Sequence, residues 1–259
     1  MAERIPSETL EGTVALVTGA SSGIGEATAL ALARRGSTVA LAARRTDRLE
    51  SVVERIRALN GSALSLQADL TDEDQARAAV ERTAQELGRL DVLVNNAGMM
   101  LLGPVVGAPV DEWQRMVDVN LLALLYCSHA ALPHLLRSAE EGPRGVADVV
   151  NISSVAGRVA RSGSGVYNAT KHGVGAFSEA LRQEVAGRHV RVSLVEPGAV
   201  ATELSGHNRP EIRERIRQRF QGIERLQAAD IADVIAYIVT RPRHVAVNEM
   251  LVRPTEQAE

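Results

Sequence analysis

Cysteine, aromatic residues and lysine are scarce in this sequence, and each scarcity narrows what the protein can be. Cys127 is the only cysteine in the 259 residues, which excludes a disulfide within the chain and fits a reducing compartment. Aromatic residues make up 2% of the chain and the formal net charge is −3, so no basic surface interleaved with aromatic rings is available. We therefore expect no nucleic-acid partner.

Long hydrophobic runs and clusters of metal ligands are missing as well. Nowhere do about 18 uncharged apolar residues follow one another, as a membrane-spanning helix requires. The amino-terminal stretch carries Glu3, Arg4 and Glu8, and so lacks the apolar core of a signal peptide. The histidines form no HExxH or similarly spaced pair, which predicts no metal site. These absences predict a cytoplasmic protein without a membrane partner.

Short β-branched runs alternate with amphipathic helical stretches along most of the chain. This alternation is typical of βαβ units, whose right-handed crossovers place helices on both faces of a parallel sheet. We therefore predict an α/β fold: one domain, residues 1–259, with a Rossmann-type, doubly wound, seven-stranded parallel sheet. Strands are expected at Val14–Thr18, Thr38–Ala43, Ala63–Gln67, Val92–Asn95, Ala147–Ile152, Arg191–Glu196 and Glu249–Arg253, and helices at Ile24–Arg35, Arg48–Leu59, Asp72–Leu87, Asp111–Arg137, Val166–Ala186 and Ile231–Thr240.

A glycine-rich turn follows the first predicted strand and directly precedes a helical pattern. Glycines there let the backbone turn tightly and approach a pyrophosphate, whose charge the helix N-terminus stabilises. The first two glycines are separated by three residues, which differs from the usual dinucleotide fingerprint. The turn predicts a nucleotide cofactor held by Gly19, Ser21, Ser22, Gly23, Ile24 and Gly25.

The choice of nucleotide depends on the end of the second strand. An acidic residue there would bind the ribose 2′-hydroxyl, whereas a basic one would bind a 2′-phosphate. Ala43 is followed by Arg44 and Arg45, so NADP(H) is favoured over NAD(H). Arg44 is the first candidate for the contact, and Arg45 is expected to point elsewhere. The alternative is that both arginines are merely solvated at a helix start.

Tyr167 and Lys171 lie four residues apart at the start of a predicted helix, and hence on one of its faces. Lys171 is the only lysine in a chain that otherwise uses arginine, which suggests that the position needs an ammonium group. Such a lysine can lower the pKa of the tyrosine and make the phenol a proton donor or acceptor. An exposed i,i+4 pair without a catalytic role is the alternative.

Two further polar residues belong to the predicted site. Ser154 ends a predicted strand 13 residues before Tyr167, where its hydroxyl can bind a reacting carbonyl oxygen; Ser153 is the alternative if the register differs. Asn120 lies inside a leucine-rich helical pattern, and asparagine is a poor helix former that needs a reason to be there.

Together these motifs, which extend over residues 12–202, resemble the short-chain dehydrogenase/reductase family. The resemblance implies that Ser154 and Tyr167 bind the substrate oxygen, that Lys171 holds the nicotinamide ribose, and that Asn120 supports a water in a proton relay. It also matches Asp69 to a residue that contacts the adenine, although Asp69 could equally cap the following helix. Further cofactor contacts are expected from Leu70, Asn96, Ala97, Gly98, Pro197, Gly198, Val200 and Thr202, besides Tyr167 and Lys171.

Segments 99–104 and 247–255 resemble the branch of the family that contains clavulanate dehydrogenase and NADP-dependent serine and 3-hydroxy acid dehydrogenases. We therefore expect a hydride transfer between NADP(H) and a small-molecule aldehyde, ketone or alcohol. The alternatives are an NAD(P)-linked serine or 3-hydroxy acid dehydrogenase, and a nucleotide-binding regulatory protein on the same fold. The helices at 111–137 and 166–186 resemble those through which family members form dimers and tetramers, which implies a homo-oligomer.

The substrate pocket is the least determined part. Residues 203–225 are rich in arginine and are expected to form a lid. The expected lining is mostly apolar, which fits a neutral carbonyl compound, while Arg158, Arg161 or Arg209 could bind a carboxylate. The expected lining residues are Met99, Met100, Leu101, Val155, Ala156, Leu204 and His207.

Overall fold

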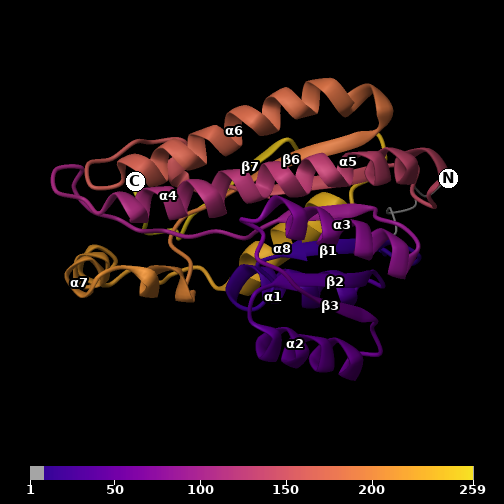
Figure 1. Ribbon diagram of the computed structural model, residues 1–259, viewed down its shortest axis with the longest axis horizontal. Coiled ribbons are helices and arrows are strands. Elements are labelled where there is room, and N and C mark those ends of the chain that lie inside the picture. Colours follow the sequence, from indigo (N-terminus) through magenta and orange to yellow (C-terminus); the bar gives the residue numbers. More distant parts are fainter. Residues whose placement is uncertain (1–8, 259) are drawn as a thin grey trace.

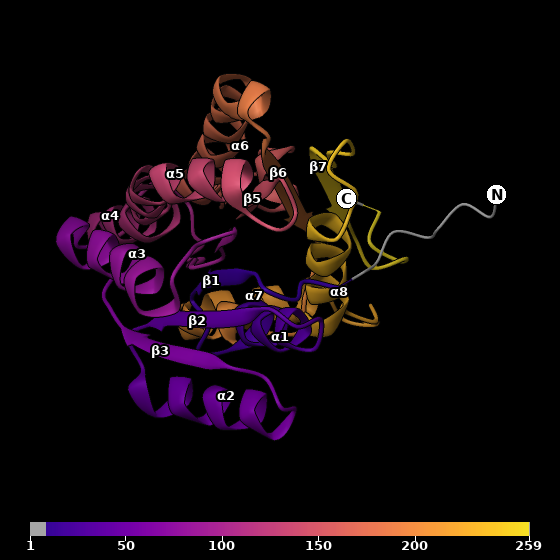
Figure 2. The same cartoon turned by 90° about the vertical axis from the view of Figure 1, so that its right-hand side faces the viewer.

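A computed structural model of the chain, which describes residues 9–258, contains one parallel sheet of seven strands in the order β3-β2-β1-β4-β5-β6-β7 (Figures 1 and 2). The predicted fold class and single domain are thereby confirmed. Residues 1–8, part of the stretch used to argue against a signal peptide, lie outside the described range. The strands are β1 (Val14–Thr18), β2 (Thr38–Ala43), β3 (Ala63–Gln67), β4 (Val92–Asn95), β5 (Ala147–Ile152), β6 (Val190–Pro197) and β7 (Glu249–Val252).

The central strands form where apolar residues run without interruption. All residues of β1, β4, β5 and β6 are buried, as expected for parallel strands that are covered on both faces. At the sheet's edge, β7 instead alternates exposed and half-buried residues. Strand β6 extends one residue beyond each predicted end, because both of the added residues keep their pairing with neighbouring strands.

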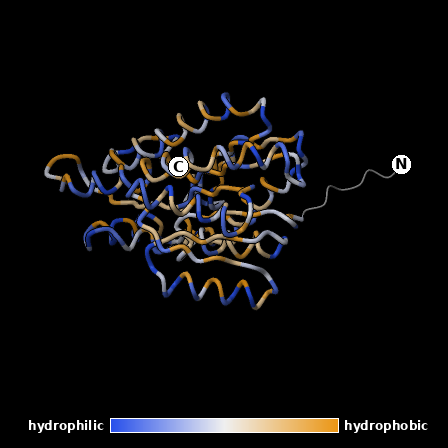
Figure 3. The backbone as a smooth tube through the Cα atoms, turned by 45° about the vertical axis from the view of Figure 1, so that its right-hand side comes forward, coloured by the Kyte–Doolittle hydropathy of each residue, from blue (hydrophilic) through white to orange (hydrophobic). Residues whose placement is uncertain are grey.

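Two helical layers cover the sheet, as Figure 2 shows. Helices α1, α2 and α8 pack on one face, and α3, α5 and α6 pack on the other. Helix α2, at the bottom of Figure 3, has hydrophilic and hydrophobic residues in each of its turns, as an amphipathic helix does. The bounds are α1 (Gly23–Ala33), α2 (Thr46–Ala58), α3 (Glu73–Leu87), α5 (Ala123–Glu141), α6 (Gly165–Val185) and α8 (Ala228–Val239).

The long helix predicted at 111–137 is in fact a continuous run with a widened turn. Helix α4 (Val110–Val117) passes through a π-helical segment, Asp118–Leu122, into α5. This run is long and apolar enough by composition alone to cross a membrane, but α5 packs on α3 and on the sheet as a core helix does. The π turn contains Asn120, so the poor helix former coincides with the irregularity.

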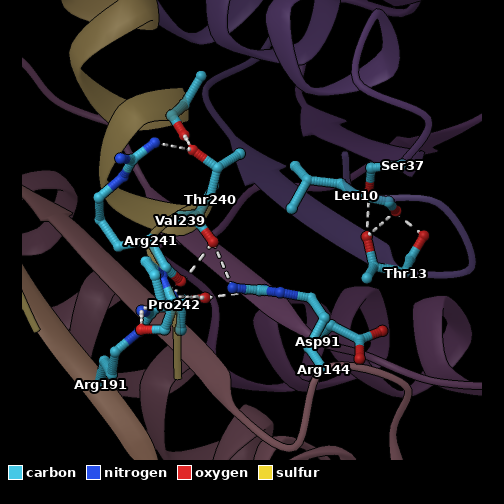
Figure 4. A network of polar contacts seen from close by, with 12 residues as sticks. Leu10, Thr13, Ser37, Asp91, Arg144, Arg191, Val239, Thr240, Arg241 and Pro242 are labelled. Carbon is cyan, nitrogen blue, oxygen red and sulfur yellow. Dashed lines mark hydrogen bonds and ion pairs between the residues drawn. The ribbon is translucent and has the colours of Figure 1, made fainter. Parts of the chain in front are cut away.

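The amino-terminal edge of the sheet is closed by a buried ionic network, part of which is drawn in Figure 4. Asp148 on β5 accepts hydrogen bonds from Arg191 on β6 and from Arg144, at 2.7–3.0 Å. Arg191 also donates to the carbonyl oxygens of Val239, the last residue of α8, and of Val245, in the loop after α8. In a sheet of this topology the crevice opens at the opposite edge, outside the carboxyl ends of the strands.

The region expected to be a lid forms a short 3₁₀ segment, Glu203–His207, and helix α7 (Pro210–Arg219), which lies apart from the two layers in Figure 1. Pro210 is the first residue of α7, where its missing N–H costs nothing. Before the helix, the Asn208 side chain bonds the backbone of Met100 and Leu102. After it, Leu226 pairs with Val200 in an isolated bridge. The segment is therefore tied to the body at both ends.

Candidate active site

One cavity of about 700 Å³ occupies the carboxyl-terminal edge of the sheet. Its wall combines the ends of the central strands with the segment before α7 and α7 itself. Parallel strands direct their final residues into the same crevice, which is why residues far apart in sequence meet there. Nearly all predicted site residues lie on this wall; Gly25, Leu101 and Asn120 do not.

The glycine-rich turn follows β1 and leads directly into α1. Gly19 and Gly23 have φ angles of 63° and 58°, which only glycine adopts without strain. At Gly25 close packing requires a glycine, because a Cβ there would overlap the Gly19 carbonyl oxygen and lie 2.5 Å from the Asn96 side-chain nitrogen. Gly25 itself does not line the cavity, while the turn brings the α1 N-terminus to the cavity, where it can bind phosphate.

The two arginines after β2 both line the cavity. Contrary to prediction, Arg45 does not point elsewhere: its guanidinium donates to the hydroxyls of Ser21 and Ser22 at 2.8–3.2 Å. It also pairs with Glu203 at 3.1 Å, which joins the turn to the segment before α7. Arg44 is exposed and its charge helps to lower the pKa of Asp69, so it faces that carboxylate.

Asp69 and Leu70 follow β3 and also lie on the wall. Asp69 accepts hydrogen bonds from the hydroxyl and the backbone N–H of Thr71, at 2.7 and 3.1 Å. The hydrogen bond from the Thr71 hydroxyl is the main reason why the pKa of Asp69 is lowered. The helix cap proposed as its alternative role belongs to Asp72, which accepts from the Gln75 N–H.

Ser154, Tyr167 and Lys171 meet at one point of the cavity wall. Ser154 follows β5 and hydrogen-bonds Tyr167 on α6, whose phenol is almost fully buried. Lys171 lies one turn further along α6, with its ammonium 6.0 Å from the centre of the Tyr167 ring and 2.8 Å from the Ile152 carbonyl oxygen. Ser153, the alternative residue, instead donates to the Lys171 carbonyl oxygen, which leaves Ser154 as the hydroxyl beside the phenol.

Burial governs the titration of this pair. It lowers the pKa of Lys171 to about 8 and raises the pKa of Tyr167, against which only the hydrogen bond with Ser154 acts. The net shift of the Tyr167 pKa is therefore upward, and Lys171 is not among its causes. The reason is that desolvation disfavours both charged forms and the ammonium is hydrogen-bonded to a backbone carbonyl.

Asn168 connects the two halves of this cluster and was not predicted. Its side chain donates to the carbonyl oxygens of Ala156 and Val159 at 2.7 and 3.0 Å, and accepts from the Arg161 N–H. It therefore ties the loop after Ser154 to the helix that carries Tyr167.

Asn120 is fully buried behind the wall. Its side chain accepts from the Met99 N–H at 2.7 Å and donates to the Met99 carbonyl and to the Thr170 hydroxyl at 2.8 and 3.1 Å. These bonds use its accepting and donating groups within the protein and join the end of β4 to α6. Its observed contacts are those of a residue that positions Met99 and the helix of Tyr167.

Residues expected to contact the cofactor in two further segments also lie on the wall: Asn96–Gly98 in the first, and Pro197, Gly198, Val200 and Thr202 in the second. The second segment is held by Gln257, a residue near the carboxyl terminus that sequence reasoning missed. The Gln257 side-chain oxygen accepts from the Ala199 N–H at 2.8 Å, and a Cβ on Gly198 would overlap it. No local pattern announces such a contact, because the partners are 58 residues apart.

The predicted substrate residues are placed correctly with one exception. Leu101 is buried among Met116 and Tyr167 and does not reach the cavity. Its neighbours Met100 and Leu102 line the cavity instead. The residues that do line the cavity are Met99, Met100, Val155, Ala156, Leu204 and His207.

Of the three arginines considered for a carboxylate, only Arg161 lines the cavity. Arg158 instead pairs with the buried Glu196 at 2.6 Å and with Glu249, which raises the pKa of Arg158. Arg209 lies between Glu112 and Glu211, at 3.4 and 3.7 Å. Both are paired with carboxylates of the protein and neither lines the cavity, so Arg161 is the one of the three that is placed to reach a substrate carboxylate.

Helix α7 and the turn after it contribute a set of wall residues that was predicted only as a region. The residue spacing in α7 could have identified some of them, because positions three and four apart share a helix face. The set is Ile212, Arg215, Ile216, Arg219, Phe220 and Arg225.

Comparison with known proteins agrees with this geometry. Residues 13–213 match the family model described as short chain dehydrogenase. The chain is 42% identical to glycine betaine reductase of Emericella nidulans over 98% of its own length, but spans only 19% of that longer protein. It is also 38% identical to an uncharacterized oxidoreductase of Staphylococcus saprophyticus, with 95% of this chain and 97% of the other covered.

Solved structures give the same result. A serine dehydrogenase in complex with NADP⁺ superimposes with a TM-score of 0.84 at 31% identity, covering 95% of this chain and 98% of that one. A short chain dehydrogenase from Burkholderia cenocepacia in complex with NADP has a TM-score of 0.81 at 32% identity, covering 94% and 97% of the two chains.

Proposed function

The chain belongs to the short-chain dehydrogenase family, and from that premise we propose that it is an NADP(H)-dependent oxidoreductase acting on a small-molecule aldehyde, ketone or alcohol. The observation that carries the proposal is the meeting of Ser154, Tyr167 and Lys171 on a cavity that is also lined by the glycine-rich turn. A regulatory nucleotide-binding protein would need the turn alone.

The nucleotide end of the cavity fits a dinucleotide phosphate. Gly19 and Gly23 adopt the conformations that let a backbone approach pyrophosphate, and α1 begins there. Arg44 and Arg45 stand at the end of β2, where a 2′-phosphate would be bound, and Ala43 offers no carboxylate to a 2′-hydroxyl. The complexes of two similar structures with NADP also support this preference.

The protein groups supply binding and a proton. The nicotinamide, when bound, supplies or accepts the hydride. Ser154 and Tyr167 donate hydrogen bonds to the substrate oxygen, where negative charge develops during reduction. Because burial raises the pKa of Tyr167, its phenol stays protonated at neutral pH and can give its proton to that oxygen. Lys171 holds the ribose, and Asn120 keeps Met99 and α6 in place.

We further propose that the reaction runs towards reduction, as in the clavulanate dehydrogenase that the sequence resembles. Tyr167, whose pKa is raised by burial, can act as the proton donor that reduction needs. A serine or 3-hydroxy acid dehydrogenase is the second candidate, supported by the structural match to serine dehydrogenase. The proposal includes action in the cytoplasm, as a homo-oligomer joined through the half-buried apolar faces of α5 and α6, and residues 203–225 as the lid.

Cofactor binding tests the proposal first. NADPH and NADH are titrated into the wild type and into Arg44→Ala, Arg45→Ala and the double variant, with binding followed by nicotinamide fluorescence. We expect NADPH to bind wild type at least tenfold more tightly than NADH, since charged hydrogen bonds contribute roughly 1.5–3 kcal/mol, and the double variant to lose this preference. Equal affinity for both cofactors would overturn the assignment of NADP(H).

Turnover is then measured with a panel of aldehydes and ketones through the absorbance of NADPH. The wild type is expected to oxidise NADPH with at least some members, while Tyr167→Phe binds NADPH normally and is inactive. Tight NADPH binding without turnover on the whole panel would support the regulatory alternative. For the arginine variants in the cofactor titration, the control is Arg34→Ala, which removes a charge at the opposite end of α1, outside the cavity.

A further inference from the structure

The cavity-facing side of α7 has an unusual composition. Ile212, Arg215, Ile216 and Arg219 all lie on the wall, and their spacing of three, four and seven residues puts them on one helix face. The isoleucines are buried, whereas the arginines are exposed. The isoleucines therefore seat the helix, and the guanidinium groups remain available at the solvent side of the cavity.

This helix face is held in a defined place. Asn208 bonds the backbone of Met100 and Leu102 just before α7. After α7, Leu226 bonds the backbone of Ala199 and Ala201 at 3.0 and 2.8 Å. Since both anchor segments follow strands of the central sheet, α7 extends from the β4 side of the cavity to the β6 side.

Two more arginines enlarge the positive charge of this end. Arg161 comes from the loop before α6, and Arg225 from the turn after α7. The Phe220 ring lies 5.7 Å from the guanidinium of Arg219 and 5.4 Å from that of Arg225, so it holds both beside it.

The acidic residues of the wall lie at the other end. They are Asp69 and Glu203. Asp69 is bonded to Thr71 and faces Arg44, and Glu203 is paired with Arg45. Neither of these pairs involves Arg215 or Arg219. The substrate end of the cavity is therefore positively charged, while the wall near Tyr167 is apolar, with Met99 and Ala156 beside it.

We propose that Arg215 and Arg219, with Arg161 and Arg225 around them, bind a carboxylate on the substrate. The inference rests on the proposed function and narrows it: the substrate is a carbonyl compound with an uncharged, apolar reacting end and a carboxylate at the far end. Guanidinium groups match the planar geometry of a carboxylate. A substrate with a quaternary ammonium group would be repelled, because such cations need aromatic rings or carboxylates around them.

A charge series of aldehydes of similar shape tests this. The three substrates are 4-formylbenzoate, 4-tert-butylbenzaldehyde and 4-(trimethylammonio)benzaldehyde, each reduced with saturating NADPH. We expect the wild-type kcat/KM to be highest for the carboxylate and lowest for the ammonium compound, and Arg215→Ala/Arg219→Ala to lose about tenfold on the carboxylate alone. Arg213→Ala, on the same exposed helix but off the wall, is the matched control and should keep the wild-type order.

Several results would overturn the inference. Equal losses on all three aldehydes would assign α7 a structural role, and a parallel loss of NADPH affinity in the double variant would assign its arginines to the cofactor phosphates. A wild type that reduces the three aldehydes with equal kcat/KM would also overturn the inference. Binding of 4-formylbenzoate is also measured by calorimetry. If no aldehyde is turned over while this binding still depends on Arg215 and Arg219, the proposed reaction fails and the carboxylate site stands.

Discussion

The nucleotide end of the cavity and the α7 end are built on opposite plans. At the nucleotide end, the polar groups follow buried strands and include backbone held by close packing, as at Gly19 and Gly25. At the other end, α7 contributes long charged side chains from an exposed helix, in which only Ile212 and Ile216 are buried. The comparison teaches that the proposed catalytic groups are placed on the rigid sheet edge, whereas the groups proposed to bind the substrate are placed where they can change without damage to the core.

The largest effect is expected at the rigid end, on the proton donor. Tyr167→Phe removes the phenol hydroxyl beside Ser154 and should lower kcat by about 10³-fold, within the range of general acid catalysis. Because the phenylalanine ring has the same shape as the tyrosine ring, NADPH affinity and the melting temperature should stay close to those of the wild type. A variant that retains more than a tenth of the activity would show that Tyr167 is not the donor.

The same substitution at the two ends sharpens the contrast. Gly25→Ala places a Cβ against the Gly19 carbonyl and the Asn96 amide, and overpacking of this kind should destabilise the fold by about 3 kcal/mol. Gly206→Ala, in the segment before α7, meets no atom within 4 Å and should change stability by less than about 0.5 kcal/mol. Urea unfolding measures both, and equal losses would break the comparison.

The buried ammonium of Lys171 is predicted to lower the stability of the folded protein, although activity depends on it. Burial lowers its pKa from 10.5 to about 8, so the folded state binds this proton more weakly than the unfolded state does. The resulting penalty is complete below pH 8 and disappears as the pH rises towards 10.5. Lys171→Met should therefore be inactive but more stable at pH 7 by roughly 3 kcal/mol.

The control for this prediction is the pH dependence itself. The stability advantage of Lys171→Met over the wild type should shrink steadily between pH 8 and 10, as followed by urea unfolding at each pH. An advantage that stays constant over this interval would mean that the buried ammonium is not its cause.

The smallest expected effect concerns Gln257. Gln257→Ala removes the acceptor of the Ala199 N–H in the segment after β6, which should cost about 1 kcal/mol of stability. We expect KM for NADPH to rise a few-fold, with kcat for a good substrate nearly unchanged. Gln221→Ala, an exposed glutamine beside α7, serves as the control. A selective loss of kcat would instead place Gln257 in the chemical step.

Prediction from sequence was most accurate where local pattern and tertiary structure coincide. The first five strands have the predicted bounds, because buried parallel strands are continuous apolar runs with turn residues at both ends. Ser154, Tyr167 and Lys171 were found because helix spacing and strand ends fix their positions. The π turn at Asn120 was not predicted, since the hydrogen bonds of the Asn120 side chain join it to Met99 and Thr170, which belong to other parts of the fold.

The sequence by itself determined the fold, the glycine-rich turn and the cluster around Tyr167, all of which depend on periodicity and on short spacings. Only the tertiary structure decided that Arg45 turns towards Ser21, that Arg158 pairs with Glu196, and that Gln257 supports the segment after β6. An arginine has the same local signature whether it meets a carboxylate of its own chain or faces a cavity. Which of the two occurs is settled by the groups that the folded chain brings within reach.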